Sequence, residues 1–201
     1  TTGLFQGGWP NSGSARSNVI HKITIATTGN STDFGDLSVA RMNAGAAGDA
    51  TRGLCSSGNA TVSGSNSNSN VIDYVTIATP GNATDFGDGT IVRTETMGAS
   101  DATRSIFGGG HGDGASSERV TIDYVTTQTT GNATDFGDLT GERFDGGANS
   151  NGTKALFTGY HDGSTSNVID QVTIQTAANA TDFGDLTVAR YGNSAASGTA
   201  A

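Results

Sequence analysis

Short stretches in which apolar and polar residues alternate recur four times along this chain. Their β-branched residues suit a pleated sheet, and the alternation places Val75 and Ile77 on the same face of one stretch. These stretches are residues 19–25, 71–77, 121–127 and 168–174. Short apolar runs that end in glycine, typical of a buried strand before a tight turn, lie at residues 2–8, 51–58, 103–110 and 153–159. The pattern therefore predicts an all-β protein.

The pentapeptide Thr-Asp-Phe-Gly-Asp also occurs four times, and it sets the period of the chain. Its phenylalanines are separated by 52, 50 and 47 residues and are Phe34, Phe86, Phe136 and Phe183. Such a period is typical of propeller blades rather than of helical solenoids. The 34 residues up to Phe34 and the 18 residues after Phe183 together make one further interval of 52. We therefore expect one domain, residues 1–201, built as a closed ring of four repeats.

Each repeat contains four candidate strands, which is the number that a propeller blade needs. After the Thr-Asp-Phe-Gly-Asp turn comes a strand that ends at an arginine, followed by a stretch of small residues such as residues 44–48 and 97–100. Small side chains suit the crowded axis, so this last strand should be innermost. Because the chain ends with such a stretch, at residues 193–197, we expect the C-terminal strand to close the first blade.

Composition and charge narrow the classes of function. The 31 glycines favour turns and short strands, and the formal charge of −9 disfavours nucleic acid as a partner. The single cysteine, Cys55, excludes an internal disulfide, and we expect it to be a small buried hydrophobe. No stretch is long and apolar enough to insert into a membrane, and the first residues do not resemble a signal peptide.

The order of elements in the repeat resembles the kelch repeat: an arginine, small residues, an apolar Gly-Gly strand and then Ile72-Asp73-Tyr74. Phenylalanine stands where kelch usually has tryptophan, and the interval from Tyr74 to Phe86 is longer. Residues 71–79 and 81–88 resemble more closely the repeats of virion structural and tail-fibre-like proteins of marine and cyanobacterial phages, over all four repeats. That resemblance implies a virion-surface or extracellular location, with other virion proteins or a host-surface glycan or protein as partners. It also allows a homo-oligomer.

The two acids of each Thr-Asp-Phe-Gly-Asp copy have a structural and a functional interpretation. They could bind Ca²⁺, which prefers carboxylate and carbonyl oxygens, but the spacing is not that of an EF-hand loop. We expect instead that aspartate caps backbone donors, glycine adopts a positive φ and phenylalanine fills the space between blades. In a phage-like chain the nearby glycosylation sequons are turn residues, although a eukaryotic secretory protein would glycosylate them; they begin at Asn30, Asn82, Asn132 and Asn179.

One arginine per repeat is the second recurring charged position. These residues, Arg41, Arg93, Arg143 and Arg190, could form a basic ring around the axis. Because the position recurs in every blade, we expect pairing with backbone carbonyls or with the acids of the strands, Asp73, Asp123 and Asp170. His21 stands at the acid's position in the first repeat, so the series of pairs is incomplete there.

The loops that follow the Gly-rich strands differ most between repeats, in both length and chemistry. They cover residues 9–17, 59–69, 111–117 and 160–166. Binding usually resides on loops held by a rigid scaffold, so we expect the partner-facing surface here. The candidate residues that bind glycan or protein are Trp9, His111, Asp113, Tyr160 and His161. Trp9 has an alternative role as a cover for its own strand, and His111 and His161 lack a third strong metal ligand.

No nucleophile, base and orienting group stand at a recognisable spacing, and residues 108–114 lack the ending of a phosphate-binding loop. We therefore expect no catalytic residues, no metal and no cofactor. The sequence predicts a non-enzymatic structural or binding module, used in virion assembly or in adhesion to a host surface. The alternative is a kelch-like enzyme or a metal-dependent lectin that acts at the loop face.

Overall fold

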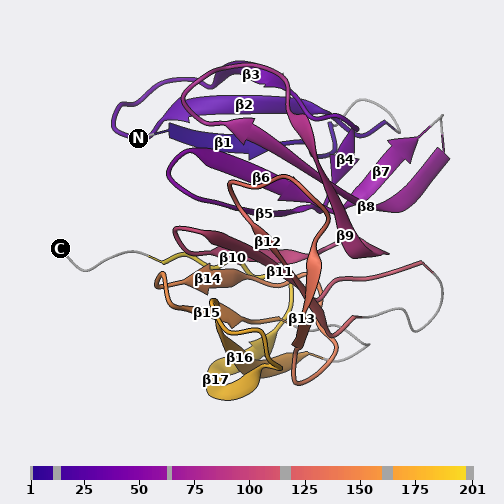
Figure 1. Cartoon of the computed structure of the whole chain (residues 1–201), viewed down its shortest axis with the longest axis vertical. Helices are drawn as coiled ribbons and strands as arrows, with labels where there is room; N and C mark the ends of the chain where they lie inside the picture. The colour runs from indigo at the N-terminus through magenta and orange to yellow at the C-terminus, as the bar shows by residue number, and fades with distance from the viewer. Residues whose placement is uncertain (1, 11–14, 63–64, 114–118, 160–164, 198–201) are drawn as a thin grey trace.

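A computed structural model describes the chain except for residues 1, 11–14, 63–64, 114–118, 160–164 and 198–201. The described residues form strands and no helix, so the prediction of an all-β protein is confirmed. The strands make four antiparallel sheets, which follow one another from top to bottom of Figure 1 in chain order. No described segment is a helix that could span a membrane.

The first sheet has three strands, β1 (Thr2–Gln6), β2 (Val19–Thr24) and β3 (Thr32–Asp36). The second contains β5 (Gly45–Gly48), β6 (Arg52–Ser56), β8 (Ser65–Thr76) and β9 (Thr84–Arg93), and β4 (Arg41–Met42) and β7 (Asn59–Val62) extend it beside β8. The third consists of β10 (Met97–Ser100), β11 (Arg104–Gly108), β12 (Thr121–Thr126) and β13 (Thr134–Asp138). The fourth consists of β14 (Ala148–Ser150), β15 (Lys154–Phe157), β16 (Ser166–Thr173) and β17 (Thr181–Arg190).

The third and fourth sheets place their strands side by side in chain order, with the small-residue strand at one edge. The small-residue strands β5, β10 and β14 of successive sheets are neighbours. Such close approach requires small side chains, since a Cβ at Gly98 would lie 2.2 Å from the carbonyl oxygen of Ala46. The place of these strands around the axis of a propeller stays a prediction.

The Thr-Asp-Phe-Gly-Asp segment is a strand, and the prediction of a turn there was wrong. The turn precedes it, and the pentapeptide forms the outer strand of each sheet. The segment contains a β-bulge. Ile72 pairs with Gly87 and Asp73 pairs with Asp85, which leaves Phe86 as the extra residue. A bulge redirects a side chain. It directs Phe86 between two sheets, where the side chain is buried.

The C-terminal strand that was predicted to complete the first sheet is not among the described strands. The first sheet ends at β1, and residues 193–197 have no strand assignment. This segment lies instead beside β14, where Asn149 Nδ2 donates a hydrogen bond to the carbonyl oxygen of Ala196 over 3.4 Å. Closure of the ring therefore stays a prediction.

The core lies between consecutive sheets rather than within any one of them. The outer-strand phenylalanine of one sheet packs against the next sheet: Phe34 joins Cys55 and Val75. The other two clusters repeat this arrangement, with Phe86 against Phe107 and Val125, and Phe136 against Phe157, Val172 and Ile174. Each sheet thus depends on its neighbour for burial, as expected of a repeat protein.

Candidate functional site

A buried arginine crosses each boundary between sheets and binds the next sheet. Arg93 is fully buried and pairs with Asp123, Nη2 to Oδ2, over 2.9 Å. Its guanidinium also donates to the carbonyl oxygens of Phe107, Gly109 and Thr121 over 3.0, 2.9 and 2.7 Å. Burial lowers the pKa of Arg93 and the charge of Asp123 opposes this shift. Because its charge is paired, the buried arginine avoids the cost of an uncompensated charge at the junction between two sheets.

The same ion pair recurs at all three boundaries. Arg41 pairs with Asp73, and Arg143 Nε pairs with Asp170 Oδ2 over 2.8 Å. The acids accept further bonds, since Asp170 receives the Thr140 hydroxyl over 2.6 Å. The expected arginine–aspartate pairing is confirmed here, and it accounts for these charges as structural rather than as an axial ring. The fourth arginine, Arg190, is exposed, and its Nε donates to the carbonyl of Val188 over 3.2 Å.

Cys55 lies at the first of these boundaries. It is buried, as expected, and burial raises the pKa of its thiol to about 11. Arg41 opposes this rise and Asp73 adds to it. Because the thiolate is the reactive form, a thiol with so high a pKa is a poor nucleophile at neutral pH. Cys55 is a packing residue.

The variable loops are held to the sheets by a repeated backbone anchor. The amide of Gly8 donates to the carbonyl of Arg41 over 2.8 Å, and Gly58 and Gly110 make the equivalent bonds in their repeats. These glycines need φ values of 102–112°, which disfavour a side chain. All three loops therefore leave the scaffold from the same kind of position.

Three of the five predicted binding residues lie in the described part of the chain. Trp9 follows β1 with 65% of its surface exposed, and Asp113 is exposed in the loop of the third sheet. His111 is half-buried and packs edge-on against Phe144, with ring centroids 5.3 Å apart. Trp9 and His111 follow strands that are two sheets apart. The other two residues, Tyr160 and His161, lie outside the described residues.

A polar connection that the sequence pattern does not predict joins three of the loops. Residues 59–69, predicted as a loop, form a hairpin of β7 and the start of β8, with its tip outside the described residues. The Arg16 guanidinium from the first loop donates to Asn59, which donates to Asn68 over 2.8 Å. Asn68 in turn donates to the carbonyl of His111 in the third loop over 3.2 Å. The loops of the first three sheets therefore form one connected surface.

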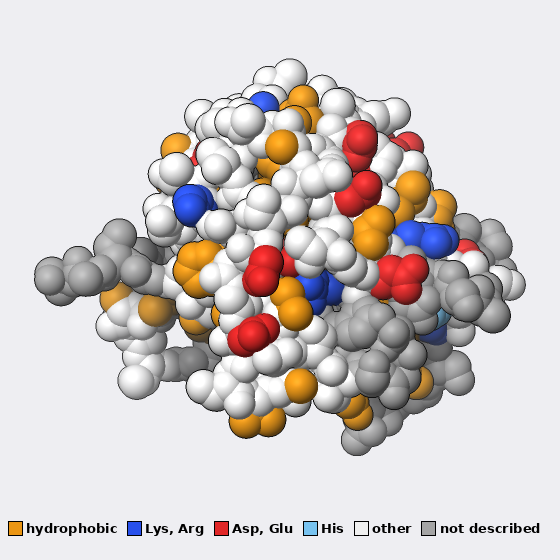
Figure 2. All heavy atoms as spheres, turned by 90° about the horizontal axis from the view of Figure 1, so that it is seen from below, with side chains coloured by type: hydrophobic (Ala, Val, Ile, Leu, Met, Phe, Trp, Pro, Cys, Tyr) orange, Lys and Arg blue, Asp and Glu red, His pale blue; other side chains and the backbone are white. Residues whose placement is uncertain are grey.

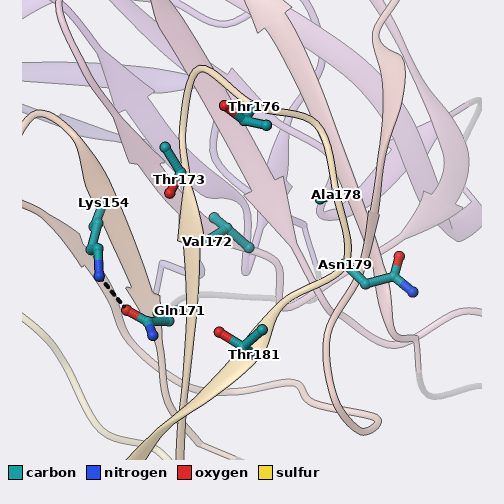
Figure 3. A pocket seen from close by; sticks show the side chains of 8 residues that line it. All are labelled: Lys154, Gln171, Val172, Thr173, Thr176, Ala178, Asn179 and Thr181. Carbon is teal, nitrogen blue, oxygen red and sulfur yellow. Dashed lines mark hydrogen bonds between the residues drawn. The ribbon is translucent and has the colours of Figure 1, made fainter.

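The hollow shown in Figure 3 belongs to the repeated scaffold. Its wall is formed by the β15–β16 pair and the turn before β17, and on one side of it Lys154 Nζ donates to Gln171 Oε1 over 2.9 Å. It has an empty volume of about 540 Å³. Equivalent turns line similar hollows in the first and third sheets. The hollow is a consequence of how each repeat turns, and it carries no special chemistry.

The acids of the pentapeptide form hydrogen bonds within the scaffold. Asp85 Oδ1 accepts the amide of Gly87 over 3.1 Å, and the other three copies repeat this bond. Asn82 of the second repeat accepts the amide of Asp36 in the first over 3.1 Å. This agrees with the structural interpretation of the segment. Within the described residues, no group of three or more histidine, cysteine, aspartate and glutamate side chains is arranged to hold a metal ion.

Comparison with known proteins yields no match, either to the model of a protein family or to a curated sequence.

Proposed function

We propose that this chain is a non-enzymatic binding module built from kelch-like blades, and that its loop face carries the partner. The observation that supports this most is the hydrogen-bonded connection from Arg16 through Asn59 and Asn68 to His111, which unites loops of different sequence. A scaffold that repeats while its connected loops vary is an arrangement typical of recognition surfaces. Trp9, exposed on the first loop, offers a flat apolar face for stacking on a sugar or a protein partner.

The sequence resemblance to phage virion repeats supports a place on a virion surface, in assembly or in adhesion to a host glycan or protein. An arrangement of four kelch-like blades is part of the same proposal. Each of the last three sheets contains the four strands that a blade needs, and their small-residue strands face one another. The buried ion pairs would hold such blades in a fixed orientation, which a rigid recognition surface requires.

A binding experiment with matched variants tests the loop face. The variant Trp9→Ala should lose at least about tenfold in binding to a glycan array or to host cells, since truncating an aromatic hot-spot residue costs about 2 kcal/mol or more. The control is Val92→Ala, which truncates another exposed apolar side chain, on β9 outside the loops. Both variants should melt like the parent protein. Equal binding by Trp9→Ala and the parent would move the site away from this face.

A further inference from the structure

The two ends of the array expose the two halves of an interface that the chain forms three times internally. At each internal boundary one half comes from the preceding sheet, as with Phe136 on the outer strand β13 and Ile106 on β11. The other half comes from the following sheet, as with Phe157, Val172 and Ile174. These five side chains are at most 5% exposed. The fourth sheet exposes the half that a preceding sheet supplies, and the first sheet exposes the half that a following sheet supplies.

On the fourth sheet the exposed first half lies at the end of the molecule seen in Figure 2. Phe183 is 54% exposed, whereas Phe34, Phe86 and Phe136 are 3% exposed or less. Val188 is 60% exposed on the same strand. Hydrophobic side chains reach the surface at several places on this end, among uncharged polar and charged ones. We call this surface the β17 face, defined by Leu156, Ile169, Phe183, Leu186 and Val188.

On the first sheet the exposed second half has the complementary residues. Phe5 is 58% exposed, although its equivalents Phe107 and Phe157 are fully buried. Ile25 is 63% exposed, whereas its equivalent Ile174 is fully buried. We call this surface the β1 face, defined by Phe5, His21, Ile23 and Ile25.

A hollow with an empty volume of about 420 Å³ on the β17 face marks where an incoming side chain fits. Leu156 and Phe183 line it, together with Lys154 and Asn149. These two apolar residues occupy the positions that Ile106 and Phe136 hold in the third sheet, where Phe157 of the next sheet packs against them. Phe5 is the residue of the β1 face at the position of Phe157.

The backbone of the β1 face matches as well. At the first internal boundary the amides of Gly81 and Ala83 donate to the carbonyls of Phe34 and Asp36, each over 2.7 Å. Gly29 and Ser31 occupy the positions of Gly81 and Ala83 in the first repeat, and both are exposed. A Cβ at Gly35 would lie 2.3 Å from the Gly81 carbonyl oxygen, whereas nothing lies within 4 Å of the Cβ position at Gly184. The β17 face therefore has an open position for this contact.

We propose that the β17 face of one copy of this chain binds the β1 face of a second copy, so that the copies associate head to tail. The interface continues the internal boundary across two molecules, with Phe5 entering the hollow beside Phe183. Such a heterologous contact forms a ring if the rotation closes and a filament if it does not. The proposal does not depend on the function of the loop face.

One position of the proposed interface differs from the internal boundaries, and it tests which residues meet across the interface. Arg190 stands where Arg41, Arg93 and Arg143 stand, and it would face His21 of the second copy instead of an aspartate. The variant His21→Asp restores the acid of the internal boundaries. It should therefore tighten association, because a desolvated arginine gains a charged partner.

The experiment measures mass by analytical ultracentrifugation from about 1 µM to about 1 mM, a span that covers weak to moderate affinities. The parent should associate with rising concentration, and His21→Asp should associate at least about tenfold more tightly. Phe183→Asp and Phe5→Asp should each weaken self-association by about 30-fold or more, as expected of a central aromatic contact. An equimolar mixture of these two variants keeps one intact pair of faces, so it should form dimers and no larger species.

Two further variants complete the experiment. Val92→Asp changes an exposed side chain of the second sheet and should associate like the parent. Ile25→Glu provides a second variant of the β1 face, and dilute melting temperatures verify that each variant folds. The proposal is wrong if the parent and His21→Asp both stay monomeric throughout the range. It is equally wrong if Phe5→Asp self-associates like the parent, since the contact would then join two identical faces or another surface.

Discussion

Phe136 and Phe183 stand in identical pentapeptides at the third and fourth outer strands, yet one is 3% exposed and the other 54%. The local backbone is the same, with φ values of 137° and 139° at the following glycines. The difference lies in the next sheet. Phe136 packs against Phe157, Val172 and Ile174, whereas the fourth sheet is the last that the structure describes.

The arginines show the same contrast in burial. Arg143 is buried against Asp170, and Arg190 at the equivalent position is exposed. A motif in this chain therefore sets the orientation of a side chain, and the neighbouring sheet sets its energetic role. This is the behaviour of a one-dimensional repeat array, in which stability is a sum over units and their boundaries. Variants at equivalent positions separate the two contributions.

The largest effect should come from removing one partner of a buried ion pair. Asp123→Ala leaves the Arg93 charge without its carboxylate and the Thr90 hydroxyl without its acceptor. The loss should be about 3–5 kcal/mol of unfolding free energy, the usual cost of an uncompensated buried charge. His21→Ala is the matched control, because His21 stands at the equivalent position of the first sheet and is exposed, and it should change stability by less than about 0.5 kcal/mol. Urea titrations measure both, and equal losses would contradict the boundary model.

Truncating Phe136 and truncating Phe183 should lower stability by different amounts, and the difference should be nearly as large as for the ion pair. Phe136→Ala opens a cavity between the third and fourth sheets and should cost about 3–5 kcal/mol. Phe183→Ala removes a half-exposed side chain and should cost less than about 1 kcal/mol in dilute solution, where copies are monomeric. Thermal melts at low protein concentration compare the two directly. A similar loss at both positions would mean that Phe183 is already covered in the isolated chain.

Glycine at the bulge separates backbone strain from contact with the next sheet. Gly87 and Gly184 have φ values of 140° and 139°, so alanine strains both backbones alike. At Gly87 the added Cβ would lie 2.5 Å from the Gly131 carbonyl oxygen, and at Gly184 it meets nothing within 4 Å. Gly87→Ala should therefore cost about 1–3 kcal/mol more than Gly184→Ala, the typical cost of overpacking. Equal melting temperatures would show that the neighbouring sheet yields without cost.

Part of this fold was predictable because the sequence repeats it. The four strands per repeat, the small-residue strand at one edge and the pairing of Arg93 with Asp123 all follow from positions that recur. The sequence of the pentapeptide predicts a turn, because glycine and aspartate favour tight turns and β-bulges for the same reasons, positive φ and local hydrogen bonds. Only the register of β8 with β9 distinguishes the two.

The connected loop surface could not be predicted from local pattern. Asn59 and Asn68 stand in a stretch of serine, asparagine and glycine that is typical of a loop, and their partners, Arg16 and the His111 carbonyl, come from other repeats. Likewise, nothing in its own pentapeptide distinguishes Phe183 from Phe136. Sequence periodicity indicates which residues are equivalent. It does not indicate which equivalent residues have a neighbour.

The smallest expected effect concerns acid stability at the turn before β11. Burial tends to raise the pKa of Asp101, but hydrogen bonds from Gln175 of the next sheet and from the amides of Thr103 and Arg104 outweigh it, so the pKa lies below its ordinary value. Folding thus favours the ionised carboxylate. The stability that the ionised Asp101 carboxylate contributes is present at neutral pH. It is lost as the pH falls below the ordinary pKa of aspartate and through the lower pKa of the folded state.

Asp101→Asn should therefore lower stability at pH 7 by less than about 1 kcal/mol, because the group is largely exposed to solvent. Its deficit against the parent should shrink as the pH falls from about 5 to about 2, where both chains carry a neutral side chain. The fourth repeat supplies the counterpart: Asn151 accepts the amides of Thr153 and Lys154 over 3.0 and 2.8 Å, and no described sheet follows it. Asn151→Asp should gain little at pH 7, because no glutamine from a following sheet donates to it. Melting temperatures across this pH range test both variants, and a constant deficit for Asp101→Asn would exclude the carboxylate's charge as its cause.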